Sequence, residues 1–239
     1  MGDTLELRRL SSVSRAWATH AKDVIFRDVW VRYDTVDRLL ALLRTKPKLG
    51  RNIRTLRVVE RGRLPSAVLE RLVPLLIDLM PNLRTLDVLY RHFGGVASLQ
   101  PARNLLSIIG LRLRSGSYQS GEDVLRFIAL FPRLESLEMS GSWDGPYAGC
   151  HAVGTLLMPR IHLKYLLLSE HHYAAPIASW IARDEVTVDR LDVVGALGVG
   201  GEPFGDMVRK IGGGVRHLEY TELTVVDILG FFAMPAPDK

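Results

Sequence analysis

Apolar and polar positions along this chain follow a unit that recurs every 25 to 30 residues. In each copy an apolar residue is followed, three and five positions later, by two more, so that the end of the unit alternates apolar and polar. Alternation with period two predicts a short β-strand with one buried face. Seven copies occur, with central leucines at Leu56, Leu86, Leu111, Leu137, Leu166, Leu191 and Leu218. The stretch VWVRY, residues 29–33, is an irregular copy upstream of the first.

The segments between these strands carry apolar residues at helical spacing. Asp34 and Ser120 are placed to cap two of the helices, with acidic residues in the first turn that follows. Pro74 is expected to interrupt a third helix, because proline removes a backbone donor. The predicted helical segments are 34–47, 66–81, 120–132, 174–185 and 202–214.

Strands and helices that alternate in this way predict an α/β protein. The strand segments IRTLRV, LRTLDV, LESLEM and LKYLLL also resemble the L-x-x-L-x-L core of leucine-rich repeats. That resemblance covers residues 53–223 and implies a leucine-rich-repeat solenoid of about seven repeats, with strands on its inner face and helices outside. The family's asparagine or cysteine after each strand is missing, so the solenoid is expected to be irregular. A doubly wound parallel sheet is the alternative, disfavoured because the strands are short and alike.

The N-terminal stretch LRRLSSVSRAWATHAKDVIFRDVWV resembles the second half of an F-box. The resemblance rests on a leucine, a Val-Ser-Arg-x-Trp core and a later pair, Phe26 and Val29. F-box segments grip the Skp-type adaptor of SCF ubiquitin ligases through helices of this kind. The resemblance therefore implies a short helical adaptor-binding segment that includes Leu7, Leu10, Val13 and Trp17.

This stretch departs from the family in one respect. The first F-box helix, usually opened by Leu-Pro, has no counterpart, since only MGDTLE precedes Leu7. Two alternatives therefore stay open beside adaptor binding: a truncated F-box protein, or a cap over the open end of the first repeat. The expected division is an F-box-like segment at 1–29, repeats at 30–230 and a tail at 231–239.

The strand residues that alternate with the leucines are expected to face a binding partner. They mix both charges with hydroxyl groups and an aromatic ring, a composition that suits recognition of a protein target, with Arg and Tyr as anchors. The candidate target-binding residues on this concave face are Arg57, Asp87, Arg112, Arg114, Glu138, Tyr165, Arg190, Asp192, His217 and Glu219.

Composition narrows the function classes further. The formal net charge is +5 and the pI about 9.5, but there is no long run of Lys or Arg, so no nucleic-acid partner is expected. No segment has the length and apolarity of a membrane span, and no signal peptide is recognisable. The single cysteine, Cys150, fits a reducing compartment. We expect an intracellular protein of the cytoplasm or nucleus that does not bind membranes.

Candidate chemistry is sparse. His171 and His172 are adjacent and lack the spacing of a metal pair, and Cys150 beside His151 does not form a catalytic pair by sequence proximity. The glycines from Gly195 do not match a nucleotide-binding motif, and no G-x-S-x-G nucleophile motif occurs. We therefore expect no catalytic residue, metal or cofactor. The predicted role is protein binding, as the substrate-recognition subunit of an SCF-type ubiquitin ligase; the alternative is a repeat-only scaffold.

Overall fold

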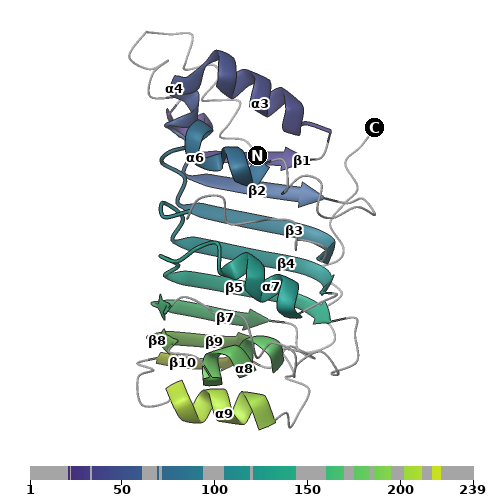
Figure 1. The fold of residues 1–239 in the computed structure, drawn as a ribbon, viewed down its shortest axis with the longest axis vertical. Helices are drawn as coiled ribbons and strands as arrows, with labels where there is room; N and C mark the ends of the chain where they lie inside the picture. Colours follow the sequence, from purple (N-terminus) through teal and green to yellow (C-terminus); the bar gives the residue numbers. More distant parts are fainter. Residues whose placement is uncertain are drawn as a thin grey trace.

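The computed structural model describes residues 21, 23–32, 34–60, 69, 72–93, 105–118, 121–143, 160–169, 175–183, 186–194, 202–211 and 217–221. Its centre is one parallel sheet of eight strands, in the order β1-β2-β3-β4-β5-β7-β9-β10 (Figure 1). Each strand thus pairs with the next one of this sheet along the chain. A second, two-stranded parallel sheet is formed by β6 and β8.

The strands vary in length although their apolar pattern repeats. Their bounds are β1 Asp28–Arg32, β2 Thr55–Glu60, β3 Thr85–Phe93, β4 Gly110–Tyr118, β5 Ser136–Trp143, β6 His162–Leu163, β7 Tyr165–Ser169, β8 Thr187–Val188, β9 Arg190–Val194 and β10 His217–Thr221. The helical segments are α3 Val36–Thr45, α4 Pro47–Gly50, the 3-10 turn η1 Val73–Leu75, α6 Leu76–Leu79, α7 Gly121–Ile128, α8 Ala175–Arg183 and α9 Glu202–Ile211.

The central leucines of the repeated pattern stand in one row across the sheet. Leu56 pairs with Leu86, Leu86 with Leu111, and the same register continues to Leu218 in β10. Val29 of β1 begins this row, so the irregular copy at 29–33 is confirmed as a strand. From Leu56 to Leu191 the row lies in the apolar core, and Val29 packs against it, because side chains at alternate strand positions share one face.

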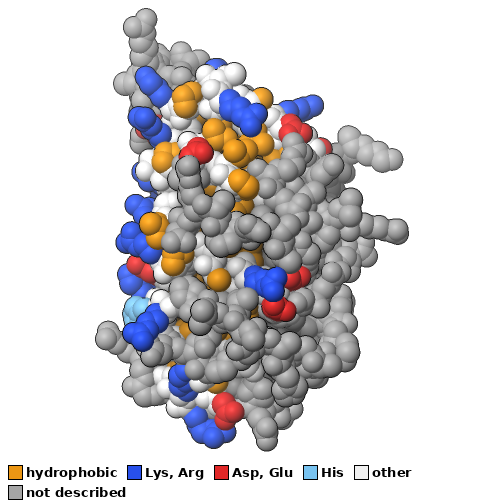
Figure 2. Space-filling view, in the orientation of Figure 1, with side chains coloured by type: hydrophobic (Ala, Val, Ile, Leu, Met, Phe, Trp, Pro, Cys, Tyr) orange, Lys and Arg blue, Asp and Glu red, His pale blue; other side chains and the backbone are white. Residues whose placement is uncertain are grey.

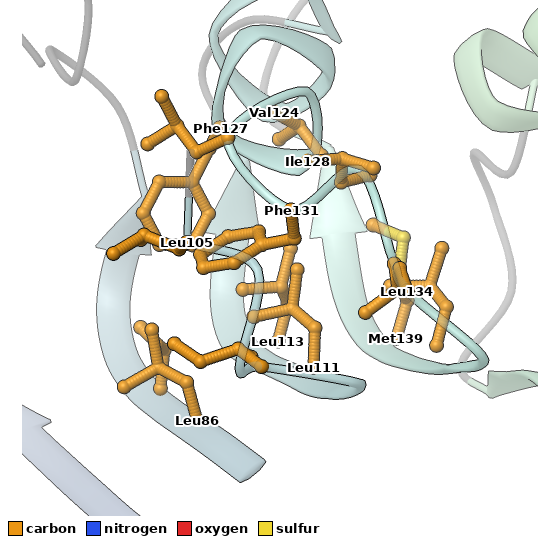
Figure 3. Packing of buried hydrophobic residues seen from close by; sticks show 14 of the residues in the cluster. Leu86, Leu105, Leu111, Leu113, Val124, Phe127, Ile128, Phe131, Leu134 and Met139 are labelled. Atoms are coloured by element: carbon orange, nitrogen blue, oxygen red, sulfur yellow. The ribbon is translucent and has the colours of Figure 1, made fainter. Parts of the chain in front are cut away.

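Helices cover this apolar face of the sheet (Figure 1). In α7, Val124, Phe127 and Ile128 are buried, and the rings of Phe127 and Phe131 meet edge to face with centroids 5.2 Å apart. Figure 3 shows these side chains packed over Leu111 and Leu113 of β4 and beside Met139 of β5. Burial of such aliphatic and aromatic side chains contributes about 1.5–3 kcal/mol each.

Two sequence expectations about helix ends meet different outcomes. Asp34 was expected to cap α3, which is wrong: the N-cap is Thr35, without a side-chain capping bond, and Asp34 pairs with Arg32 at 3.1 Å. Pro74 does interrupt its segment, because it lies in the 3-10 turn η1 from which α6 starts afresh. Ser120 lies outside the described residues.

Close packing of helical segments is visible at Gly50, the last residue of α4. A Cβ atom placed there would lie 1.8 Å from the carbonyl oxygen of Leu79 at the end of α6. Only a residue without a side chain allows this approach of the two backbones.

The expected leucine-rich-repeat solenoid is wrong as a description of the fold, while most of the F-box-like segment lies outside the described residues. The structure shows an α/β fold with a sheet core, and it does not show a solenoid. The physical reason is the unevenness of the described elements: strand lengths from five to nine residues in the main sheet and helical segments from three to ten residues form no repeated structural unit. The shared apolar pattern reflects a common strand register.

Candidate functional site

The side of the sheet turned away from the helices carries polar residues and is called the polar face here. Its residues alternate with the buried leucines, as in β7, where buried and half-buried positions alternate. The strand register aligns one row of this face across the whole sheet. That row is Trp30, Arg57, Asp87, Arg112, Glu138, Leu167, Asp192 and Glu219.

Asp87 on β3 is the centre of an ion-pair network on the polar face. Arg57 Nε on β2 donates to Asp87 Oδ2 at 2.5 Å. From β4, Arg114 donates from Nε to Asp87 Oδ1 at 3.1 Å and from its terminal nitrogen to Oδ2 at 2.5 Å. The Asp87 side chain is fully buried beneath the two guanidinium groups, which remain partly exposed. One carboxylate therefore fixes two arginines and leaves a local net charge of about +1, since two cations surround one anion.

Arg57 also reaches the edge of the sheet. Its guanidinium carbon lies 4.0 Å from the centre of the Trp30 ring, a cation–π contact. Trp30 is 62% exposed on β1. The next row of the polar face lies two residues farther along the strands. In that row Leu89 is 37% exposed beside the buried Val59. A large aromatic surface thus stands beside cations that are already held in place.

A second cluster occupies the other half of the polar face. Arg112 pairs with Glu138 at 2.9 Å, and Arg190 binds Asp192 at 2.9 Å two residues along β9. The Arg190 guanidinium lies 5.6 Å from the centre of the Tyr165 ring. Burial raises the pKa of Tyr165 to about 12. The hydrogen bond to Asp192 and the negative charges of Asp192 and Glu138 also raise this pKa, whereas the positive charge of Arg190 lowers it.

A shallow pocket of about 210 Å³ opens at the amino-terminal end of β4, β5 and β7. Gly110 forms part of its lining, and the missing side chain leaves the space that Thr85, Ser136 and Tyr165 surround. Charged groups at its rim are already paired, since Lys164 donates to Glu135 at 2.8 Å. The pocket is small, and it suits one side chain of a partner rather than a cofactor.

The structure brings most of the predicted target-binding residues onto one face. Arg57, Asp87 and Arg114 meet directly, and a second group forms around Asp192. Two predictions need correction, because Asp87 and Asp192 are buried on this face rather than exposed to a partner. Their burial follows from the long arginine side chains that fold over them. The predicted residues of the second group are Arg112, Glu138, Tyr165, Arg190 and Asp192.

The last two candidates and the adaptor-binding residues have different outcomes. His217 and Glu219 pair in register with Arg190 and Asp192 through the backbone, while their side chains are not described. The residues expected to bind the adaptor lie outside the described ranges, as do the pairs 150–151 and 171–172. These adaptor candidates are Leu7, Leu10, Val13 and Trp17.

Sequence reasoning missed Trp30. It was assigned to an irregular strand copy, and its place on the polar face follows from the pairing of Trp30 with Arg57. Alternation within VWVRY could have indicated it, because the two valines face the core and the ring between them must face the other way.

Other kinds of site find no support in the described part of the chain. Among those residues, no three His, Cys, Asp or Glu side chains come together as ligands of a metal ion. None of the helices in the described ranges combines the length and apolar character needed to cross a bilayer. Comparison with known proteins finds no matching family model, no matching curated protein and no matching solved structure.

Proposed function

We propose that this protein is a non-catalytic protein-recognition module that holds its partner on the polar face of the sheet. The observation that carries the proposal is the exposed Trp30 ring with the Arg57 guanidinium 4.0 Å from its centre. Tryptophan and arginine are the residues most often found to dominate the binding energy of protein interfaces. Here the arginine is also held by the buried Asp87.

The fixed geometry of this cluster supports binding. An arginine that is free in solution loses about 0.5–1.5 kcal/mol of side-chain freedom when a partner immobilises it. Arg57 and Arg114 are ordered in advance by the same carboxylate. Their exposed nitrogens therefore meet a partner at a lower entropic cost.

The mixture of exposed charges on the face supports specificity for a protein. Along one row, Arg57 and Arg112 are partly exposed and so is Glu138, while Asp87 is buried beneath its arginines. A partner must match these charges to avoid like-charge contacts, and such matching selects among proteins. A polyanion would meet the carboxylate of Glu138 on the same row.

A finer form of the proposal is that the module is the substrate-recognition subunit of an SCF-type ubiquitin ligase. Its support is the F-box-like stretch around Leu10 and Trp17. In this arrangement residues 7–29 bind the Skp-type adaptor, the polar face binds the target, and other subunits carry out ubiquitin transfer. The competing form is a binding scaffold without ligase attachment.

The finer form is tested by a pull-down with purified Skp-type adaptor. The intact chain is compared with Leu10→Ala/Trp17→Ala, and circular dichroism checks that both are folded. Adaptor captured by the intact chain and lost with the folded variant supports ligase attachment. If the folded intact chain captures no adaptor, ligase attachment is wrong and the scaffold form remains.

The polar face is tested by quantitative affinity capture from cell extract. The bait is the intact chain, Trp30→Ala, or a control, Arg209→Ala, which changes an exposed side chain on α9. A protein retained by the intact chain and the control, and depleted with Trp30→Ala, supports the proposal. Equal capture by all three baits would show that the polar face around Trp30 is not the binding surface.

A further inference from the structure

A row of arginines runs along the edge of the sheet where the first strands begin. Arg27, Arg54 and Arg84 are the residues directly before β1, β2 and β3, and they are called the arginine edge here. The backbone ladder holds them in register, because Arg54 N donates to Arg27 O and Arg84 N donates to Arg54 O, each at 2.8 Å. The positions are separate from the polar face proposed above.

Two of these side chains are directed along the edge. Arg54 Nη1 donates to the carbonyl oxygen of Asn82 at 3.4 Å, and Arg84 Nη1 donates to that of Ser107 at 3.5 Å. Each guanidinium thus reaches the turn before the next strand and keeps further N–H donors for another molecule. All three arginines are exposed. Within the described ranges no carboxylate lies within 4.0 Å of them.

The same edge is charge-compensated farther along the sheet. The equivalent positions before β4, β5, β7 and β9 are Ile109, Glu135, Lys164 and Asp189. Lys164 pairs with Glu135 at 2.8 Å, and His162 lies 3.3 Å from Asp189. Figure 2 shows Lys and Arg side chains gathered along the side where the strands begin. Among the described residues directly before the strands of the main sheet, the cations without an acidic partner are thus those before β1, β2 and β3.

The fold itself does not need this row of like charges. Neighbouring strands lie about 4.8 Å apart, and like charges directly opposite each other on a sheet destabilise it. Ile109 occupies the same register position before β4 without a charge. The repulsion among the three arginines is relieved when an anionic molecule lies across them.

We infer that the arginine edge binds a short acidic segment of another polypeptide, laid across the strand ends. The row spans about 10 Å, two strand spacings, which matches about three residues of an extended chain. Two or three carboxylates of such a segment meet the exposed guanidinium donors in charge-assisted hydrogen bonds. A nucleic-acid strand is disfavoured, because continuation along the edge would bring its phosphates to Glu135 and Asp189.

The test uses the full chain and a fluorescein-labelled hexaglutamate peptide in fluorescence anisotropy, at salt concentrations of about 50 and 200 mM. Arg54→Gln/Arg84→Gln removes two charges of the edge. Arg126→Gln/Arg209→Gln removes two exposed arginine charges from α7 and α9 and is the matched control. A third variant, Arg54→Lys/Arg84→Lys, changes the same positions and keeps both positive charges. It separates the effect of charge from a folding defect caused by substitution at these positions.

The expected result is an affinity reduced about five- to tenfold in the glutamine variant, since each exposed pair contributes modestly. The control and the lysine variant are expected to stay within about twofold of the intact chain, and added salt to weaken all binding. Equal affinity of the intact chain and the glutamine variant, or no peptide binding by the intact chain, would overturn the inference. Tighter binding of an oligothymidylate of matched charge would also overturn it, in favour of a nucleic acid.

Discussion

The carboxylate of Asp87 on β3 accepts a 2.5 Å hydrogen bond from Nε of Arg57 on β2, in the row that also contains Trp30. Through this contact a fully buried anion fixes a cation that lies against an exposed ring. The relationship joins the stability of the sheet to the shape of its polar face. The two effects can be separated experimentally, because Asp87 contributes to both and Trp30 mainly to the surface.

Replacement of Asp87 by Asn is expected to lower the free energy of unfolding by about 1–3 kcal/mol, because two arginines lose a charged acceptor in a buried position. Asp206→Asn, at an exposed ion pair on α9, is the control and is expected to change stability by less than about 0.5 kcal/mol. Urea unfolding followed by circular dichroism measures both. Equal stability of the two variants would show that the Asp87 network does not stabilise the fold.

Replacement of Trp30 by Ala is expected to change the free energy of unfolding by no more than about 1 kcal/mol, since an exposed cation–π contact is worth about that much. Trp180, fully buried in α8, is the comparison: Trp180→Ala is expected to cost about 3–5 kcal/mol. Thermal unfolding of the two variants checks the contrast. A Trp30 variant as unstable as the Trp180 variant would mean that the ring is a core residue and not a free surface.

Replacement of Gly50 by Ala is expected to destabilise the protein by about 3 kcal/mol or more, since the added Cβ meets backbone rather than a movable side chain. Gly110→Ala is the control, because its added Cβ lies 3.1 Å from the side chain of Thr85, which can rotate away. We expect the Gly110 variant to lose less than about 1.5 kcal/mol. Chemical denaturation compares them, and similar losses would contradict the close packing of α4 on α6.

Tyr165 is expected to make the protein less stable at alkaline pH. Its pKa is raised to about 12 in the folded protein, from 10.0 in the unfolded chain. Between these values the unfolded chain loses a proton that the folded chain keeps. The stabilising contribution is therefore complete below pH 10 and is lost as pH rises through 12.

Tyr165→Phe tests this expectation, because phenylalanine has no proton to lose. Urea unfolding at a series of alkaline pH values should show a shallower decline for the variant than for the intact chain. Direct titration of tyrosines by NMR should show a late resonance for Tyr165 that disappears in the variant. A Tyr165 resonance that titrates near pH 10.0 would contradict the burial of Tyr165 and its hydrogen bond to Asp192.

The sequence by itself determined where the strands of the main sheet lie. The unit with apolar residues at fixed spacing indicated them, because a side chain on a strand alternates faces whatever its neighbours are. It also located the helices α3, α7, α8 and α9 and the interruption at Pro74, which depend on local spacing and on the missing proline donor. The charged residues of the polar face followed from the same alternation, while Trp30 was missed.

The tertiary structure alone decided how these elements assemble and which polar residues meet. The sequence pattern does not distinguish an irregular leucine-rich-repeat solenoid from an α/β fold around a continuous sheet, because both use the same buried strand. It does not show that Asp87 is covered by Arg57 and Arg114, since those residues are 30 and 27 positions away and meet only through strand register. The expected cap at Asp34 is wrong for a local reason: the N-cap is Thr35, and the carboxylate of Asp34 pairs with Arg32 two positions upstream. Long-range pairing therefore fixed the candidate site, while local pattern fixed the parts from which it is built.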